Sequence, residues 1–291
     1  MPILLTGSSG FLGSYLYKEL KARGHTVFGL SRHGPDLIGD INLPDLGLKE
    51  FPKVDAVVHS AALVSFKPSD SKRLYAVNWM GTANVILWMS TLGLKRLFHI
   101  STAYLYDHND YERSKRSAEE IALRFNATII RPSIIIGDSK VEGIPPLSGF
   151  YIVIKAVDAA KRWVEDKTAL PELKLVIRIK GNPQGKLNLI PVDVVAKNTA
   201  DIIDADKQGI FHITHPEPPT LESLAEAVSE AVGVEARIVP DFKANPAERI
   251  VALMTKSLAP YLGGDSLKSD ICYPPLSREF IVSSVRAFLK A

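Results

Sequence analysis

Near its start the chain reads Thr6-Gly7-Ser8-Ser9-Gly10-Phe11-Leu12-Gly13. This stretch follows the apolar run 2–5, and apolar residues then recur at helical spacing over 11–23, up to Gly24. A glycine-rich turn between a strand and a helix lets backbone N–H groups approach a pyrophosphate, and the helix N-terminus attracts anions. The stretch therefore predicts a dinucleotide site at the first strand–helix junction. The residues expected to contact the dinucleotide here are Gly7, Ser9, Gly10, Phe11, Leu12 and Gly13.

Beyond this turn, short apolar segments alternate with segments of helical periodicity. We expect further strands at 26–30, 37–38, 56–59, 96–100 and 127–131. We expect helices at 71–92 and 111–125. Strands that alternate with helices at this spacing form βαβ units, which build a parallel sheet with helices on both faces. The predicted fold class is α/β, a doubly wound parallel Rossmann sheet with a smaller mixed α/β C-terminal part.

The pattern becomes less regular after Gly137. The segment 141–149 holds two glycines and two prolines and is predicted to be a loop. Helices are expected at 150–165, 192–205, 220–232, 245–262 and 276–289, and strands at 187–190, 211–214 and 236–239. We predict an NADP-binding Rossmann domain at 1–140, with 186–205 returning to it, and a substrate-binding part made of 141–185 and 206–291.

The end of the second strand indicates which dinucleotide is bound. An acid about 20 residues after the glycines would bond the ribose 2′-hydroxyl of NAD, whereas an arginine would suit the 2′-phosphate of NADP. The strand ends in Leu30-Ser31-Arg32-His33, without a carboxylate. Arg32 offers a planar fork for phosphate, so we predict NADP in preference to NAD, with Ser31 and Arg32 in contact. The alternative is an ordinary surface arginine.

A second motif, Tyr111-Glu112-Arg113-Ser114-Lys115, lies in a predicted helix. Positions i and i+4 share a helix face, so the phenol of Tyr111 and the ammonium of Lys115 would project the same way. A nearby positive charge lowers the pKa of a tyrosine, and such a tyrosine can pass a proton to a carbonyl oxygen. A dinucleotide carries a hydride, and proton plus hydride is the reduction of a carbonyl.

Composition bounds the other classes of function. The 291 residues carry a net charge of +3 with scattered basic residues, which argues against nucleic acid as a partner. Cys272 is the only cysteine, which excludes a disulfide within the chain and fits a reducing cytoplasm. No apolar run reaches the roughly 20 residues of a membrane helix, and the glycine turn leaves no room for a signal peptide. We also find no ligand spacing for a metal and expect none.

Together these motifs resemble those of the extended short-chain dehydrogenases/reductases, the NAD-dependent epimerase/dehydratase superfamily. The resemblance covers nearly the whole chain. It implies cofactor contacts from the adenine-side segment, the fourth-strand motif 57–62, the helix motif 78–82 and the nicotinamide loop, namely Asp40, Ile41, Ser60, Ala61, Ala62, Asn78, Arg131, Pro132 and Ser133. It also implies that Pro191-Val192-Asp193 is where the chain returns to the sheet.

The resemblance also implies catalytic roles. The fifth-strand motif Ser101-Thr102-Ala103-Tyr104 puts the catalytic Ser/Thr role on Thr102, which would hydrogen-bond the substrate oxygen. Tyr111 would protonate that oxygen, and Lys115 would bond the nicotinamide ribose and lower the pKa of Tyr111. We expect His59 to be a buried, hydrogen-bonded histidine. Two features depart from the family pattern: the interval from Thr102 to Tyr111 is short, and Glu112 stands where sugar-nucleotide enzymes often have glycine.

For the substrate, 130–139, 59–64 and 188–193 resemble the thioester reductase and fatty-acyl reductase branch. This favours a carbonyl or an acyl thioester. The alternatives are a sugar-nucleotide epimerase, dehydratase or reductase, for which Lys186 stands where an arginine is common, then an alcohol dehydrogenase. A non-catalytic NADP-binding sensor is the alternative of another class. Helices 71–92 and 111–125 resemble the pair that forms a homodimer interface in relatives, although packing within one subunit would explain them equally.

Overall fold

The structure is a computed structural model, which describes residues 1–140, 149–167, 175–264 and 266–290. Its chain divides into two compact units. Unit 1 consists of Met1–Ser133 and Val192–Thr214, and unit 2 of Ile134–Pro191 and His215–Ala291. Each is described by itself below. The loop predicted at 141–149 lies outside the described residues except for Gly149.

Unit 1 is built on a seven-stranded parallel sheet with the order β10-β6-β5-β4-β1-β2-β3. The strands are β1 (Pro2–Thr6), β2 (Thr26–Ser31), β3 (Leu37–Ile38), β4 (Ala56–His59), β5 (Arg96–Ile100), β6 (Thr128–Pro132) and β10 (Ile210–Ile213). The central strands are buried almost throughout, as the continuous apolar runs of a parallel sheet require. The predicted α/β Rossmann sheet is confirmed.

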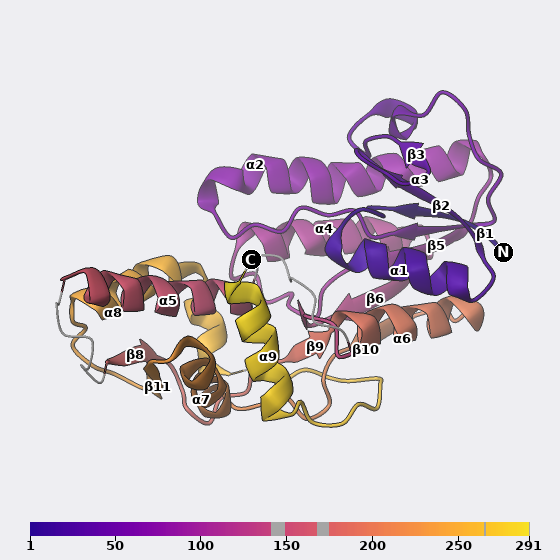
Figure 1. Cartoon of the computed structure of the whole chain (residues 1–291). Helices are drawn as coiled ribbons and strands as arrows, with labels where there is room; N and C mark the ends of the chain where they lie inside the picture. The colour runs from indigo at the N-terminus through magenta and orange to yellow at the C-terminus, as the bar shows by residue number, and fades with distance from the viewer. Residues whose placement is uncertain (141–148, 168–174, 265, 291) are drawn as a thin grey trace. The chain divides into compact units, whose positions relative to one another are not determined.

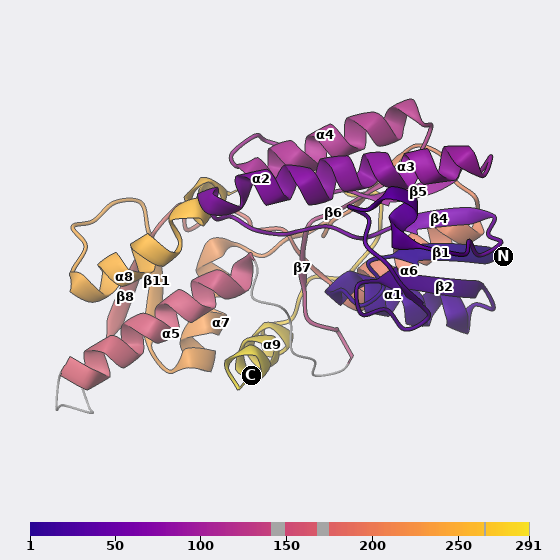
Figure 2. The ribbon, with the colours of Figure 1, turned by 90° about the horizontal axis from the view of Figure 1, so that it is seen from above.

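Helices cover both faces of this sheet. The helices of unit 1 are α1 (Phe11–Ala22), α2 (Ser71–Leu74), α3 (Gly81–Thr91), α4 (Asp110–Arg124) and α6 (Val192–Asp204). Figures 1 and 2 show α3 and α4 over one face and α1 and α6 over the other. Trp88 and Met89 of α3 pack with Leu4 and Val57 from the strands in one buried cluster. Because β2, β1, β4 and β5 are neighbouring parallel strands, their carboxyl ends lie along the same edge of the sheet.

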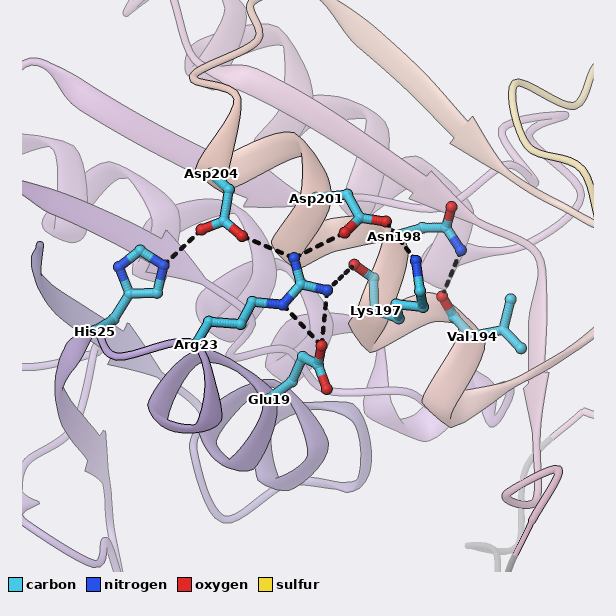
Figure 3. Close-up of polar contacts among 8 residues, drawn as sticks. All are labelled: Glu19, Arg23, His25, Val194, Lys197, Asn198, Asp201 and Asp204. Carbon is cyan, nitrogen blue, oxygen red and sulfur yellow. Dashed lines mark hydrogen bonds and ion pairs between the residues drawn. The ribbon is translucent and has the colours of Figure 1, made fainter.

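A charged cluster joins α1 to α6. The guanidinium of Arg23 pairs with Glu19 on its own helix and with Asp201 and Asp204 on α6, each at 2.7 Å (Figure 3). His25 Nε2 lies 2.7 Å from the second carboxylate oxygen of Asp204. Because one planar group serves three carboxylates, this contact fixes the two helices side by side.

Unit 2 contains two short parallel pairs of strands with helices around them. β7 (Ile134–Ile136) pairs with β9 (Leu189–Pro191), and β8 (Val176–Lys180) pairs with β11 (Glu235–Val239). The helices are α5 (Phe150–Lys167), α7 (Leu221–Val232), α8 (Pro246–Met254) and α9 (Arg278–Leu289), and a 3₁₀ segment spans Lys256–Gly263. Helix α5 packs on α8 and α7 packs on α9 (Figure 1).

The structure differs from the sequence-based expectations at several places. The helix expected over 245–262 ends at Met254 and is followed by the 3₁₀ segment. Residues 186–191, expected to return to the Rossmann domain, lie in unit 2, and the chain enters unit 1 again at Val192. Strands β7 and β8 were not expected. The long helix expected over 71–92 contains a π-helical stretch, Tyr75–Met80, between α2 and α3. Strand β10 lies in the stretch that we expected to belong to the substrate-binding part, and it pairs with β6 in the larger sheet, because its apolar residues complete the edge beside Ile129 and Ile130.

Candidate active site

The glycine turn has no room for side chains at two of its glycines. Gly7 has φ +74°, and a Cβ there would lie 2.6 Å from the backbone nitrogen of Ala61. A Cβ on Gly13 would lie 2.0 Å from the carbonyl oxygen of Gly7. Helix α1 then begins at Phe11 with Gly10 as its N-cap, which makes no side-chain capping bond. Its first N–H groups therefore point toward the turn, as a pyrophosphate site requires.

A cavity of about 200 Å³ opens beside this turn. Sequence-predicted residues line it, namely Gly7, Gly10, Ser31, Arg32, Asp40, Ile41, Ser60, Ala61 and Ala62. Further residues that we had not predicted also line it: Leu30, Gly39, Asn42, Leu63, Arg73 and Val77. Arg73 comes from α2, and only the packing of that helix brings it here. Leu12 and Gly13 are buried in α1 and do not line the cavity. The glycine cradle and this lining fit a dinucleotide.

Lys115 is buried on α4, with 3% of its surface exposed. Its Nζ donates a hydrogen bond of 2.6 Å to the carbonyl oxygen of Ile100, the last residue of β5. Burial lowers the pKa of Lys115 to about 8, and the charge of Glu119 opposes that decrease. The end of β5 and helix α4 are therefore joined directly at this lysine.

The expectation that Lys115 lowers the pKa of Tyr111 is wrong for the chain by itself. Burial raises the pKa of Tyr111 to about 12, and the neighbouring charge of Glu112 adds to the rise. The Lys115 ammonium is directed to Ile100 instead. Phe66 packs edge-on against the Tyr111 ring, with 5.8 Å between ring centroids. At neutral pH the phenol is protonated, which is the form that donates a proton.

Thr102 lies just beyond β5 and is 6% exposed. Its Oγ1 accepts a hydrogen bond of 3.2 Å from the N–H of Tyr104, so its own hydrogen can be donated elsewhere. The neighbouring N–H groups of Ser101 and Ala103 donate to the carbonyls of Ile130 and Pro132, which extends the pairing of β5 with β6. The backbone that carries Thr102 is therefore held at the sheet edge.

Asn78 connects the cofactor side of the site to α4. It is buried in the π-helical stretch, a local helix form that is frequent at functional sites. Its Oδ1 accepts from the N–H of Leu63, and its Nδ2 donates to the carbonyl of Leu63 and to Ser114 Oγ. The Ser114 hydroxyl donates in turn to the carbonyl of Tyr111. Asn78 thus holds the backbone on both sides of the site.

His59 is the buried, hydrogen-bonded histidine that we expected. Its ring nitrogens lie 2.7 Å from Thr6 Oγ1 and 2.9 Å from Thr82 Oγ1. Burial, together with the nearby charge of Lys115, lowers the pKa of His59 to about 3. The ring is therefore neutral and serves to join β1, β4 and α3.

In the predicted nicotinamide loop, Arg131-Pro132-Ser133, the side chain of Arg131 already makes other contacts. The Arg131 guanidinium forms a bidentate pair with Glu119 of α4, which is 4% exposed. A cofactor contact from Arg131 would therefore come from its backbone. Ser133 Oγ is buried and has no hydrogen-bond partner among the described residues, which leaves it suited to a polar group such as a carboxamide.

Within the described ranges 1–140, 149–167, 175–264 and 266–290, no group of three or more His, Cys, Asp or Glu side chains is arranged to hold a metal ion. Within the same ranges, none of the helices combines the length and the apolar character needed to cross a bilayer.

Comparison with known proteins identifies the family. Residues 3–161 match the model of the NAD dependent epimerase/dehydratase family. A protein named sterol demethylase protein B from Methylococcus capsulatus is 27% identical over 47% of this chain. The chain spans only about half of that relative's length, 52%. A 4-hydroxy-2-methyl-3-oxo-4-farnesyl-3,4-dihydroquinoline-1-oxide ketoreductase from Stigmatella aurantiaca is 23% identical over 92% of this chain and 85% of its own.

A solved structure resembles the whole fold. The terminal R domain from the myxalamid PKS-NRPS biosynthetic pathway superimposes with a TM-score of 0.72 at 19% identity. The match covers 99% of this chain and 89% of that domain. At this identity the likeness concerns the fold alone.

Proposed function

Because this chain belongs to the NAD-dependent epimerase/dehydratase family, we propose that it is an NADP(H)-dependent oxidoreductase that reduces a carbonyl or an acyl thioester. One observation carries the proposal: β5 and α4 bring Thr102, Tyr111 and Lys115 into the same unit as the cavity beside the glycine turn. The Stigmatella relative, named a ketoreductase, supports carbonyl reduction.

In this proposal each side chain has one task. A reduced nicotinamide, when bound, supplies the hydride. The Thr102 hydroxyl donates a hydrogen bond to the substrate oxygen and orients the carbonyl. Tyr111, protonated at neutral pH, gives its proton to that oxygen as the carbon is reduced. Lys115, with a pKa of about 8, would hold the cofactor ribose in place of its bond to Ile100, and its ammonium would stabilise the phenolate left on Tyr111.

Turnover of the full chain tests this function. NADPH consumption is followed with an acyl-CoA, a ketone and a nucleotide sugar, on the native chain and on Tyr111→Phe. Chromatography of the nucleotide sugar is added, because its epimerisation or dehydration would consume no net NADPH. We expect Tyr111→Phe to lower kcat by about 10²- to 10⁴-fold with its NADPH affinity unchanged. Tyr17→Phe serves as the control, because the Tyr17 hydroxyl is an exposed group that bonds Lys21 and Asp36. Undiminished turnover by Tyr111→Phe would remove the proposed proton donor.

The same assay separates the alternatives. Turnover of the acyl-CoA or the ketone, with none of the nucleotide sugar, supports the proposed substrate class. Turnover of the nucleotide sugar alone would favour the epimerase/dehydratase alternative. Tight NADPH binding without turnover of any substrate would favour a sensor.

NADP preference is proposed on Arg32, which lines the cavity where β2 ends. Its guanidinium can form a bidentate contact with a 2′-phosphate. We expect Arg32→Ala to weaken NADPH binding about tenfold and to leave NADH binding nearly unchanged, as measured by fluorescence titration. Equal losses for both nucleotides would contradict a phosphate contact.

We also propose a cytoplasmic homodimer. The outer side of the 75–91 helix exposes Trp79, Met80 and Leu87, and α4 exposes Leu123. Exposed apolar side chains on these two helices suit contact with a second copy. Cys272 is exposed and unpaired, as suits a reducing compartment. Sedimentation of the native chain and of Leu87→Glu tests the dimer, which the charge should dissociate.

A further inference from the structure

The segment 103–110 runs from one proposed catalytic hydroxyl to the other. It leaves the sheet after Thr102 and enters α4 just before Tyr111. The two hydroxyls can meet one substrate oxygen only if this segment has a defined conformation. Its backbone has no regular structure before Asp110, so side chains must hold it.

Glu112, the residue after the proposed proton donor, holds the middle of this segment. It is fully buried. One carboxylate oxygen, Oε2, accepts hydrogen bonds from the N–H groups of Tyr106 at 2.9 Å and His108 at 3.1 Å. Its own N–H donates to the side chain of Asn109, the N-cap of α4. The same residue therefore ties the segment to the first turn of the helix that carries Tyr111.

Two arginines of α4 support the same segment. Arg113 donates to the carbonyl of Asp107 at 2.8 Å, and Arg116 donates to the carbonyl of Leu105. Arg116 also pairs with the Asp107 carboxylate at 3.1 Å. Asp107 has φ +66°, a conformation that a residue other than glycine keeps only when its surroundings impose it. Both arginine side chains are about two-fifths exposed, whereas Glu112 is buried, so Glu112 forms the inner contact.

We propose that Glu112 is a positioning residue: by holding the backbone of Tyr106 and His108, it fixes the segment between Thr102 and Tyr111 and so brings their hydroxyls to one substrate oxygen. This rests on the proposed function. It also accounts for the glutamate at a position where a glycine could make neither bond to the segment.

Two roles of Glu112 must be separated, because its charge also acts on Tyr111. Glu112→Gln keeps the length and an oxygen that can accept both N–H bonds but removes the charge. Glu112→Asp keeps the charge but is too short to reach both N–H groups. A positioning role predicts that the activity of Glu112→Gln resembles that of the native chain and that the activity of Glu112→Asp does not. A purely electrostatic role predicts the reverse.

The experiment measures three quantities on the native chain and on both variants. They are kcat with the best carbonyl substrate, the Kd of NADPH, and hydrogen exchange at the amides of Tyr106 and His108. For Glu112→Asp we expect kcat to fall about 10- to 100-fold, faster exchange at both amides, and a Kd within about twofold of native. For Glu112→Gln we expect values within about threefold of native. Glu120→Asp, at an exposed site on the same helix, is the control.

The outcomes distinguish this inference from the proposed function. If the native chain reduces no substrate, the proposed function fails, and hydrogen exchange alone decides whether Glu112 fixes the segment. Native-like kcat and exchange in Glu112→Asp would overturn the inference even in an active enzyme. A kcat loss confined to Glu112→Gln would overturn it in favour of the charge.

Discussion

Replacing Lys115 by methionine should make the protein's stability less dependent on pH. The native lysine is buried, and its Nζ donates a hydrogen bond to the carbonyl of Ile100. Methionine fills a similar volume and carries no charge. The substitution therefore removes the cost of holding an ammonium in the interior and loses one hydrogen bond.

The pKa of Lys115 gives the size of this effect on the free energy of unfolding. A decrease from 10.5 to about 8 corresponds to about 3 kcal/mol, at about 1.4 kcal/mol for each pH unit. The folded chain releases this proton near pH 8, whereas the unfolded chain retains it up to pH 10.5. The cost is therefore present in full below pH 8 and disappears as the pH rises to 10.5. At neutral pH the variant gains about 3 kcal/mol and loses about 1 kcal/mol with the bond to Ile100.

Urea unfolding followed by circular dichroism measures the effect at neutral pH and at pH 10.5. We expect Lys115→Met to be more stable than the native chain at neutral pH by about 2 kcal/mol and less stable at the higher pH by about 1 kcal/mol. Lys95→Met, at an exposed position, should follow the native pH dependence. If the difference between Lys115→Met and the native chain is the same at both pH values, Lys115 has an ordinary pKa and the reasoning fails.

Two further predictions concern the scaffold of the site. Arg23→Ala should lower the free energy of unfolding by about 2 kcal/mol, because three carboxylates lose their shared partner (Figure 3). Lys197→Ala removes an exposed pair of the same cluster and should cost under about 0.5 kcal/mol in the same denaturation assay, so equal losses would contradict this. Gly13→Ala should abolish NADPH binding in a fluorescence titration, because its Cβ would lie 2.0 Å from the Gly7 carbonyl oxygen. Gly263→Ala, at a glycine that has open space around its Cβ and no positive φ, should bind NADPH normally. NADPH binding by both variants would show that the glycine turn can accommodate a Cβ at position 13.

Local sequence signals were sufficient for strands β1 to β6 of the larger sheet, but they did not assign β10 to it. Strands β1 to β6 are short apolar runs with helices of 3.6-residue periodicity between them, so their positions along the chain could be predicted directly. In unit 2 the sequence predicted β9 and β11 but not β7 and β8. β7 has only three residues, and β8 pairs with β11, which is far away in the sequence. Such pairs depend on tertiary contacts that no local pattern reports.

The candidate site was predictable in its parts but not in its electrostatics. The spacing of Tyr111 and Lys115 indicates a shared helix face. It does not reveal that Lys115 donates to Ile100, or that the buried charge of Glu112 adjoins the phenol. For the same reason Arg73 in the cavity and the pairing of Arg131 with Glu119 were not foreseen, since both depend on how helices pack on the sheet.

A crystal structure of the chain with NADP⁺ and a substrate ketone tests the central claim most directly. The account predicts the Tyr111 and Thr102 hydroxyls within about 2.6–3.2 Å of the ketone oxygen, with Lys115 on the nicotinamide ribose. A nicotinamide bound elsewhere, or a Tyr111 hydroxyl turned to bulk solvent, would contradict it.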